Sequence, residues 1–202
     1  PSDDTTMELW LAREGAAPVR FLFRDQLRDD AAAVIHTFQH AGISTLLLSG
    51  DRAAITRQVG AELGINEAHG DMTPLQKTER IAALKEAGAK VLMVGDGLND
   101  APSLAAAHVS MSPTSAMDIT QNAADIVFQG KALGAVTRVW KVATFSQVLV
   151  RENFLLAIGY NVIAIPMAVA GYVTPLVAAI AMSSSSLLVI ANAMRLNLRR
   201  NA

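Results

Sequence analysis

The longest uncharged stretch of the chain lies near its C-terminal end. Between residues 153 and 194 there are 42 consecutive positions without Asp, Glu, Lys or Arg. A helix needs about 20 apolar residues to cross the hydrocarbon core of a membrane, so this run is long enough for two. The segment "GYVTP" divides it, with Gly171 and Pro175 as helix breakers. We therefore predict two membrane-spanning helices, 153–171 and 175–194, joined by a tight turn.

Basic residues flank both outer ends of this run, and the turn between the helices has none. They are Lys131, Arg138, Lys141, Arg151, Arg195, Arg199 and Arg200. Because positive charge is retained on the cytoplasmic side, both ends are expected in the cytoplasm and the turn outside. The alternative is a buried hairpin of a soluble core. It is disfavoured because ordinary core elements are much shorter than this run.

The rest of the chain differs sharply in charge. Residues 1–130 carry a net charge of −7, whereas residues 131–202 carry +6. Such asymmetry indicates two parts in two environments. The acidic part argues against a nucleic-acid partner, which requires basic surface. The chain has no cysteine, so it can form no disulfide.

The first 130 residues alternate between short apolar strands and helices. Expected strands are "STLLLS" (44–49), "KVLMV" (90–94), "HVSMS" (108–112) and "ADIVF" (124–128). Expected helices cover 29–42, 52–64 and 73–88, the last with Thr73 as its cap and Pro74 at its first position. Continuous apolar strands that alternate with helices predict an α/β fold with a parallel sheet covered on both faces.

Two polar loops follow strands of this predicted sheet, where function usually resides. In "SGD", Ser49 offers a hydroxyl and backbone N–H groups that can hold phosphate oxygens. In "GDGLND", Asp96 and Asp100 are hard oxygen ligands suited to Mg²⁺. Lys77, near the start of its helix, can place a positive charge on a phosphate. Each residue alone is more often structural, but the ordered set predicts a phosphoryl-transfer site.

Several of these motifs together resemble the phosphorylation domain of P-type ATPases, which has a haloacid dehalogenase-like fold. They are "SGD" (49–51), "TPLQK" (73–77) and "MVGDGLNDAPSLAAAHVSMS" (93–112). The segment "FRDQLRDDA" (23–31) looks like the family's Asp-x-x-Arg element, with Asp25 and Arg28 in its places.

The resemblance implies a role for each matching residue. Asp96 is expected to bind the catalytic Mg²⁺, and Asp100, Asn99 and Gly97 to support it. Lys77 and Ser49 are expected to contact an aspartyl phosphate. Asp51 and Arg28 complete the expected catalytic set.

Polar residues within the two predicted spans indicate the transported ion. Tyr160 and Asn161 lie mid-span, and Met182 and Ser186 share one helical face. A thioether is a soft ligand that suits Cu(I). The pattern resembles the copper-transporting group of heavy-metal (type IB) P-type ATPases, whereas zinc and cadmium members carry an acidic residue in the last span. The alternative is that Met and Ser serve helix packing.

The histidines show no ligand spacing apart from His36 and His40, four apart on a helix. Exposed pairs of this kind are more often chance than a site, and we predict none there.

Three motifs that a copper pump needs are absent from the 202 residues: Asp-Lys-Thr-Gly, Thr-Gly-Glu and Cys-Pro-Cys. We therefore expect a C-terminal part of an ATP-driven Cu(I) exporter that works through an aspartyl phosphate and is inactive alone. The expected cofactor is Mg²⁺, with ATP bound mainly by other segments. The expected partners are the lipid bilayer, the rest of the ATPase chain and a copper-donor chaperone. The expected location is a bacterial inner membrane, with the soluble domain in the cytoplasm.

The expected division of the chain has five parts. These are the tail of a nucleotide-binding domain (1–20), the phosphorylation domain (21–131), a connecting helix (132–152), two transmembrane helices (153–196) and a cytoplasmic tail (197–202). Alternatives are a non-catalytic membrane-anchored remnant or binding module, and a pump for another heavy metal. A free-standing phosphatase is weaker, because "RFLFRD" (20–25) lacks the second Asp two residues after the first.

Overall fold

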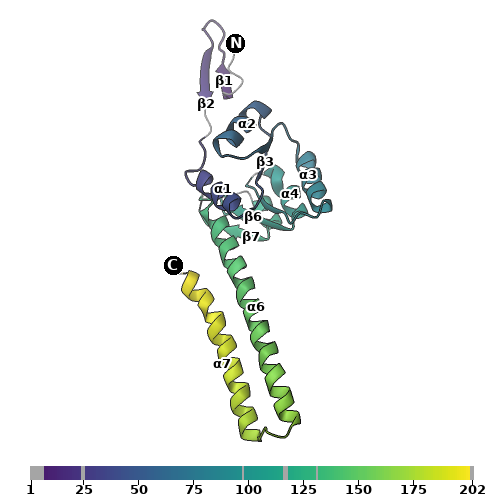
Figure 1. The fold of residues 1–202 in the computed structure, drawn as a ribbon. Coiled ribbons are helices and arrows are strands. Elements are labelled where there is room, and N and C mark those ends of the chain that lie inside the picture. The colour runs from purple at the N-terminus through teal and green to yellow at the C-terminus, as the bar shows by residue number, and fades with distance from the viewer. Residues whose placement is uncertain (1–6, 24–25, 97, 116–117, 131, 201–202) are drawn as a thin grey trace. The chain divides into compact units, whose positions relative to one another are not determined.

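The computed structural model describes residues 7–23, 26–96, 98–115, 118–130 and 132–200 (Figure 1). The chain divides into two compact units, Pro1–Thr137 and Arg138–Ala202.

An antiparallel hairpin begins the first unit. Strands β1 (Met7–Leu11) and β2 (Val19–Phe23) pair in the register Met7↔Phe23. Their large apolar side chains are exposed, among them Trp10 at 56% and Leu22 at 55%. The sequence pattern had not indicated this hairpin.

A β-α-β segment follows helix α1 (Ala31–His40). Strands β3 (Leu46–Leu48) and β4 (Glu67–His69) are parallel and are connected by helix α2 (Ala53–Glu62). The helix lies close to the strands at Gly60, where a Cβ atom would approach the Ala68 Cβ to 2.7 Å. Glycine at this position therefore permits the close packing of α2 on the sheet.

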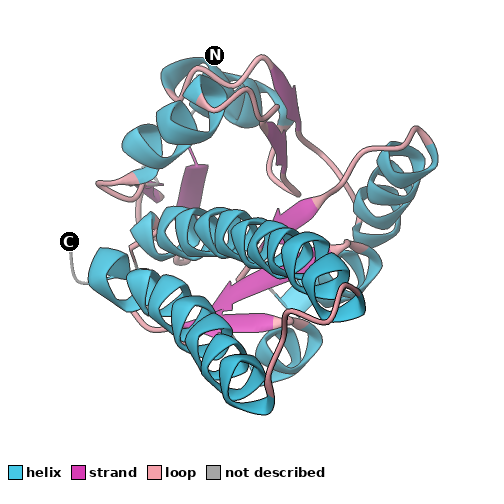
Figure 2. Ribbon diagram, turned by 60° about the horizontal axis from the view of Figure 1, so that its bottom comes forward, coloured by secondary structure: helices cyan, strands magenta, loops and turns pink. Residues whose placement is uncertain are grey.

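The second half of the unit contains three parallel strands in the order β5-β6-β7. Its elements are α3 (Pro74–Glu86), β5 (Leu92–Val94), the 3₁₀ turn η1 (Leu98–Asp100), α4 (Ala101–Ala106), β6 (Val109–Pro113), α5 (Asp118–Ala123) and β7 (Ile126–Phe128). Figure 2 shows these strands in magenta. Ile81, Leu104 and Met111 are each 1% exposed and form the centre of the core.

The predicted parallel α/β class is confirmed, but one detail of the sheet was wrong. A single sheet was expected, whereas β3 pairs with β4 in one sheet and β5 joins β6 and β7 in another. Among the described residues no ladder joins β3 to β5. Strand β4 had not been predicted because its sequence, "EAH", lacks the apolar pattern of a strand.

The second unit consists of two long helices that lie side by side in Figures 1 and 2. Helix α6 (Gly134–Val169) begins in the first unit and continues through the predicted connecting segment and first span. Helix α7 (Pro175–Arg200) follows a turn in which Gly171 has a φ of +79°. Both helices are long and apolar enough to cross a membrane.

Polar contacts join the two helices near one end. Asn192 donates from Nδ2 to Oδ1 of Asn153 at 3.0 Å. Arg195 forms an ion pair with Glu152 at 2.7 Å. Glu152, the only acidic residue between positions 131 and 202, thus lies opposite Arg195 of α7.

Candidate functional site

Helix α3 fixes the position of Lys77. Its N-terminus carries a reciprocal capping box, in which Gln76 donates its backbone N–H to Oγ1 of Thr73 and accepts the N–H of Thr73 at 2.8 Å. Pro74 occupies the first helical position, as the sequence predicted. Lys77 and Ile81, four residues apart, form the buried face of the helix. The lysine side chain is therefore directed into the unit.

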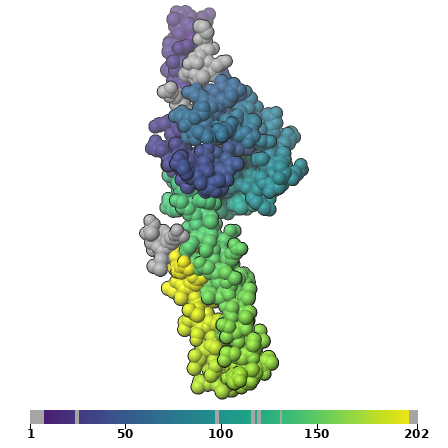
Figure 3. Space-filling view, viewed as in Figure 1, coloured from purple at the N-terminus to yellow at the C-terminus, as the bar shows by residue number. Residues whose placement is uncertain are grey.

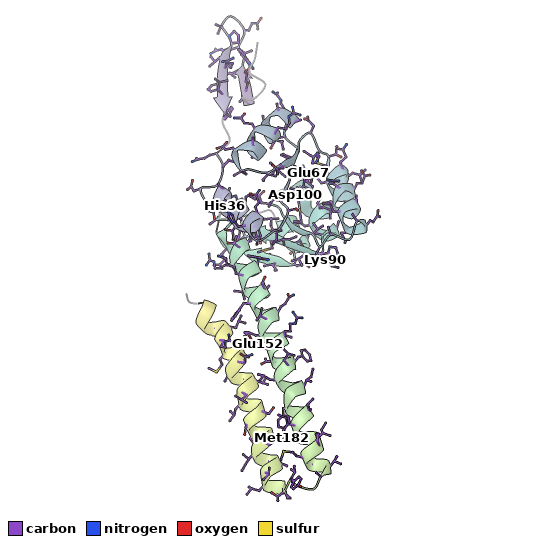
Figure 4. All side chains as sticks on the ribbon, viewed as in Figure 1. His36, Glu67, Lys90, Asp100, Glu152 and Met182 are labelled. Carbon is purple, nitrogen blue, oxygen red and sulfur yellow. The ribbon has the colours of Figure 1, made fainter. Side chains whose placement is uncertain are left out.

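The buried charge of Lys77 is matched by Asp100. The Lys77 Nζ donates to Oδ1 of Asp100 at 2.7 Å, and the two side chains are only 10% and 14% exposed. An ammonium group so poorly solvated needs an opposite charge close by. Figure 4 labels Asp100 in the interior of the first unit. The structure thus brings together two of the predicted site residues from segments 23 positions apart.

The loop after β5 folds back so that Asp100 lies against Gly95. A Cβ atom at position 95 would lie 3.0 Å from the Asp100 Cβ and 3.2 Å from its Oδ2. Only glycine leaves this space open. The next residue, Asp96, accepts a hydrogen bond from Arg28 at 2.5 Å, with side chains 55% and 30% exposed. One turn of chain therefore presents two carboxylates, each next to a cationic side chain.

The donor set of this loop fits Mg²⁺. In proteins Mg²⁺ is usually held by one or two carboxylates together with water and substrate phosphates. Among the described residues no group of three or more His, Cys, Asp or Glu side chains gathers at one point. Asp96 and Asp100 would hold the ion, and Lys77, which donates to Asp100, would supply positive charge to a phosphate oxygen. When bound, Mg²⁺ would act as a Lewis acid that polarises the phosphoryl oxygens.

The second predicted loop, "SGD", has its own local network. Ser49 donates from Oγ to Oδ2 of Asp51 at 2.7 Å and accepts the Asp51 N–H at 3.1 Å. The loop is held by the chain after β4, because Asp71 donates its N–H to the carbonyl of Asp51 at 2.6 Å. Gly70 lies so close that a Cβ would approach the Asp51 carbonyl oxygen to 2.7 Å. The loop is therefore rigidly placed at the end of β3.

The predicted residues thus fall into three local groups in the first unit: Lys77 with Asp100, Arg28 with Asp96, and Ser49 with Asp51. Asn99 lies in η1 and is exposed. Asp25 and Gly97 lie outside the described residues. The catalytic roles assigned to these residues stay predictions.

The four predicted ligands of the transported ion are arranged differently. Tyr160 lines a hollow between α6 and α7 with Ser184 and Ser185. Met182 is 72% exposed. Asn161 and Ser186 each donate to a carbonyl of their own helix, at 2.9 Å and 3.1 Å. The two helices alone do not gather the four residues, and their role as ligands stays a prediction.

Two titratable groups of the first unit have shifted pKa values. The hydroxyl and the backbone N–H of Ser110 both donate to Asp125 at 2.8 Å and lower the pKa of that carboxyl below its ordinary 3.8. Desolvation, with added repulsion from Lys90 and Lys85, lowers the pKa of His108 below its ordinary 6.5. The hydrogen bonds that lower the pKa of Asp125 stabilise its carboxylate beside β6, whereas the lowered pKa of His108 means that its protonated form is disfavoured there.

Sequence reasoning missed two aspartates that position the site. Asp71 has a φ of +54° and accepts the N–H of Ala53 at 3.0 Å, so it caps α2 from a distant loop. Asp30, two residues after Arg28, accepts the N–H of Gly134 at 2.7 Å at the start of α6. Neither cap is adjacent in sequence to the helix it serves, so a local pattern could not reveal it.

A family model for haloacid dehalogenase-like hydrolases matches residues 6–108, half of the chain. The chain belongs to this family. Several of the similar proteins are cation-transporting ATPases. The cation-transporting P-type ATPase B of Mycobacterium tuberculosis (strain H37Rv) is 37% identical over 188 residues, 93% of this chain and 25% of that protein.

Another relative is the nitrogen fixation protein FixI of Rhizobium leguminosarum bv. viciae. It is 50% identical over 196 residues, which is 97% of this chain and 26% of that protein. The chain thus spans about a quarter of the length of the curated relatives it matches.

Solved structures support the same assignment. A zinc-transporting PIB-type ATPase in the E2.Pi state matches with a TM-score of 0.82 and 26% identity, over 96% of this chain and 32% of that one. The catalytic domain of the CPx-ATPase CopB-B matches with a TM-score of 0.52 and 31% identity, over 63% of this chain and 54% of that one. The chain corresponds to the C-terminal part of a P-type ATPase. Its haloacid dehalogenase-like domain precedes two apolar helices that match a transmembrane hairpin.

Proposed function

We propose that the intact protein is an ATP-driven Cu(I) exporter that forms an aspartyl phosphate, and that this chain supplies part of its phosphoryl-transfer site and two membrane helices. The observation that carries the catalytic part is the buried Lys77–Asp100 ion pair at 2.7 Å, next to Asp96 and its partner Arg28. Burying the lysine and the carboxylate of this pair costs solvation free energy, and such buried charged groups are often found at functional sites.

Each residue has a distinct task in this proposal. Asp96 and Asp100 hold Mg²⁺, and Arg28 orients Asp96 through their hydrogen bond. Lys77 stabilises the charge on the transferred phosphoryl oxygens. Ser49 donates its hydroxyl to a phosphoryl oxygen after leaving Asp51, its partner in the structure.

The acceptor aspartate is proposed to come from a segment outside the 202 residues. Among the described ladders, β3 pairs only with β4 and β5 only with β6, so each has one edge open for another strand. A parallel strand added at either edge would end on the side where Ser49 and Gly95 lie. An aspartate at the end of such a strand would face the Mg²⁺ site.

The choice of Cu(I) rests on the helices. The uncharged run 153–194 contains no carboxylate, the charged oxygen ligand that most favours an ion such as Ca²⁺. It contains Met182, whose soft thioether is 72% exposed in the two-helix unit and is therefore available to a site shared with other helices. Tyr160, Asn161 and Ser186 would complete the site with residues of other helices. The bacterial plasma membrane as location and a copper-donor chaperone as partner belong to the same proposal.

A zinc pump is the second candidate, because the solved structure that covers 96% of the chain is a zinc-transporting PIB-type ATPase. The two candidates predict different chemistry in α7. A borderline ion such as Zn²⁺ is normally bound by imidazole, thiolate or carboxylate groups. None of these groups occurs between residues 153 and 194.

The test uses the intact ATPase, purified in detergent, with ATP hydrolysis measured in Cu(I) and in Zn²⁺. We expect Cu(I) to stimulate turnover, and M182L to abolish that stimulation. M194L is the matched control, because Met194 lies in the same helix and is similarly exposed. Stimulation by Zn²⁺ alone would overturn the choice of copper. Mg²⁺-dependent ATP turnover by the 202 residues alone would overturn the proposal that the acceptor aspartate lies elsewhere.

A further inference from the structure

Two exposed histidines on helix α1 lie within contact distance of each other. The Nε2 atoms of His36 and His40 are 3.0 Å apart, and the ring centroids are 4.1 Å apart at an interplanar angle of 44°. Figure 4 labels His36 on this helix, and Figure 3 shows the helix, in dark blue, at the surface of the first unit. Neither residue has a role in the proposed phosphoryl transfer.

The helix holds the pair on a fixed frame. Residues four apart lie one above the other on a helix face. The opposite face is anchored by Ala31, Val34 and Phe38, all less than 10% exposed. The C-terminus is secured as well, because Ile43 donates its N–H to the carbonyl of Phe38 at 3.0 Å. The two imidazoles therefore project from a backbone that is fixed by packing.

We propose that His36 and His40 form a surface binding site for a divalent transition-metal ion, with Cu²⁺ and Ni²⁺ preferred over Zn²⁺. Metal–imidazole bonds of about 2.0–2.1 Å and nitrogens 3.0 Å apart give an N–metal–N angle of about 94°. That angle fits neighbouring positions of a square-planar or tetragonal site, which Cu²⁺ and Ni²⁺ favour. A tetrahedral Zn²⁺ site would need the nitrogens roughly 3.3 Å apart.

The metal-free pair already holds the two Nε2 atoms at the separation that the proposed site needs, and the rings have only to turn so that both lone pairs face the metal. At 3.0 Å one neutral imidazole donates its Nε2 hydrogen to Nε2 of the other. For binding, the donor ring moves that hydrogen to Nδ1, and both Nε2 lone pairs then face the metal. No net proton is released, and little side-chain entropy is lost because the rings are already together.

The remaining coordination positions are filled by water, because no third His, Cys, Asp or Glu of the described residues joins the pair. His40 lies in the last turn of α1, where the helix dipole also favours a cation. The site is therefore open, exchangeable and chemically distinct from the oxygen ligands Asp96 and Asp100. It stands independently of the proposed transport function.

The experiment titrates the purified 202-residue chain in detergent with Cu²⁺ in excess Mg²⁺. Binding is followed by calorimetry, and nitrogen coordination by electron paramagnetic resonance. We expect one site whose spectrum shows two equivalent imidazole nitrogens. H36Q and H40Q should each weaken binding at least ~10-fold and leave a one-nitrogen spectrum. H69Q is the matched control, because His69 is exposed in β4 away from the pair, and should bind as the unchanged chain does.

A second variant tests the spacing itself. Ala32 is exposed four residues before His36, so adding Ala32→His to H40Q rebuilds the spacing on the same face. We expect this double variant to regain the two-nitrogen spectrum. The proposal is overturned if H69Q weakens binding as much as H36Q does. It is overturned equally if the unchanged chain shows no two-nitrogen signal while its circular dichroism is that of a folded protein.

Discussion

Removing the charge of Lys77 tests whether its ion pair with Asp100 stabilises the loop 95–100. In Lys77→Met the aliphatic stem stays, but Asp100 keeps a carboxylate that is only 14% exposed and loses the ammonium 2.7 Å away. Breaking a buried pair by removing one partner costs about 3–5 kcal/mol, because the poorly solvated carboxylate loses the opposite charge beside it. For a unit of this size that loss lowers the melting temperature by roughly 10 °C or more.

The assay is thermal unfolding of the purified chain in detergent, followed by circular dichroism. Lys90→Met is the matched control, because Lys90 is exposed (labelled in Figure 4) and its loss should change stability by about 0.5 kcal/mol or less. The double variant K77M/D100N removes both charges and should recover most of the loss. If K77M melts within about 2 °C of the unchanged chain, the ion pair contributes nothing and the reasoning is refuted.

Three further predictions concern the frame around the site. Thr73→Ala removes the capping box of α3 and should lower the free energy of unfolding, measured in urea, by about 1 kcal/mol. An unchanged urea midpoint would contradict the role of the cap. Gly70→Ala places a Cβ 2.6 Å from the Cα of Ala53 and should lower the free energy of unfolding by about 1–3 kcal/mol. We expect faster amide hydrogen exchange in α2. Exchange as slow as in the unchanged chain would show that the backbone accommodates the methyl group without strain. Ser110 lowers the pKa of Asp125, so its contribution is complete above the ordinary value of 3.8 and is lost as the pH falls through the lower folded value. Ser110→Ala should therefore be destabilising at neutral pH and converge with the unchanged chain in acid, and a difference that is constant with pH would exclude this linkage.

The longer helices and strands β3, β5, β6 and β7 were predictable because their signals are local, whereas the short helices α4 and α5 were not predicted. Thr73 and Pro74 mark the start of α3, and the uncharged run after Asn153 marks the two long helices. The candidate site was predictable as a set of residue types, since an acidic loop after a buried strand and a helix lysine suit phosphate chemistry. That Lys77 meets Asp100 at 2.7 Å could not be derived, because it depends on how α3 packs against η1.

Features set by long-range packing escaped prediction. Strand β4 is polar and is defined by its pairing with β3. Asp30 caps α6 from 104 residues away. The contact between His36 and His40 was discounted, because sequence spacing shows a shared face and not the distance between two nitrogens.

The most direct test of the central claim is phosphorylation of the intact ATPase by radiolabelled ATP, trapped in acid. We predict a labelled protein that requires Mg²⁺ and the transported metal ion and whose bond is cleaved by hydroxylamine, as expected for an acyl phosphate. Asp100→Asn and Lys77→Met should each lower the labelling at least ~10-fold, whereas Lys90→Met should not. Labelling that is independent of Mg²⁺, or unchanged in both Asp100→Asn and Lys77→Met, would contradict the proposal that this loop is the phosphoryl-transfer site.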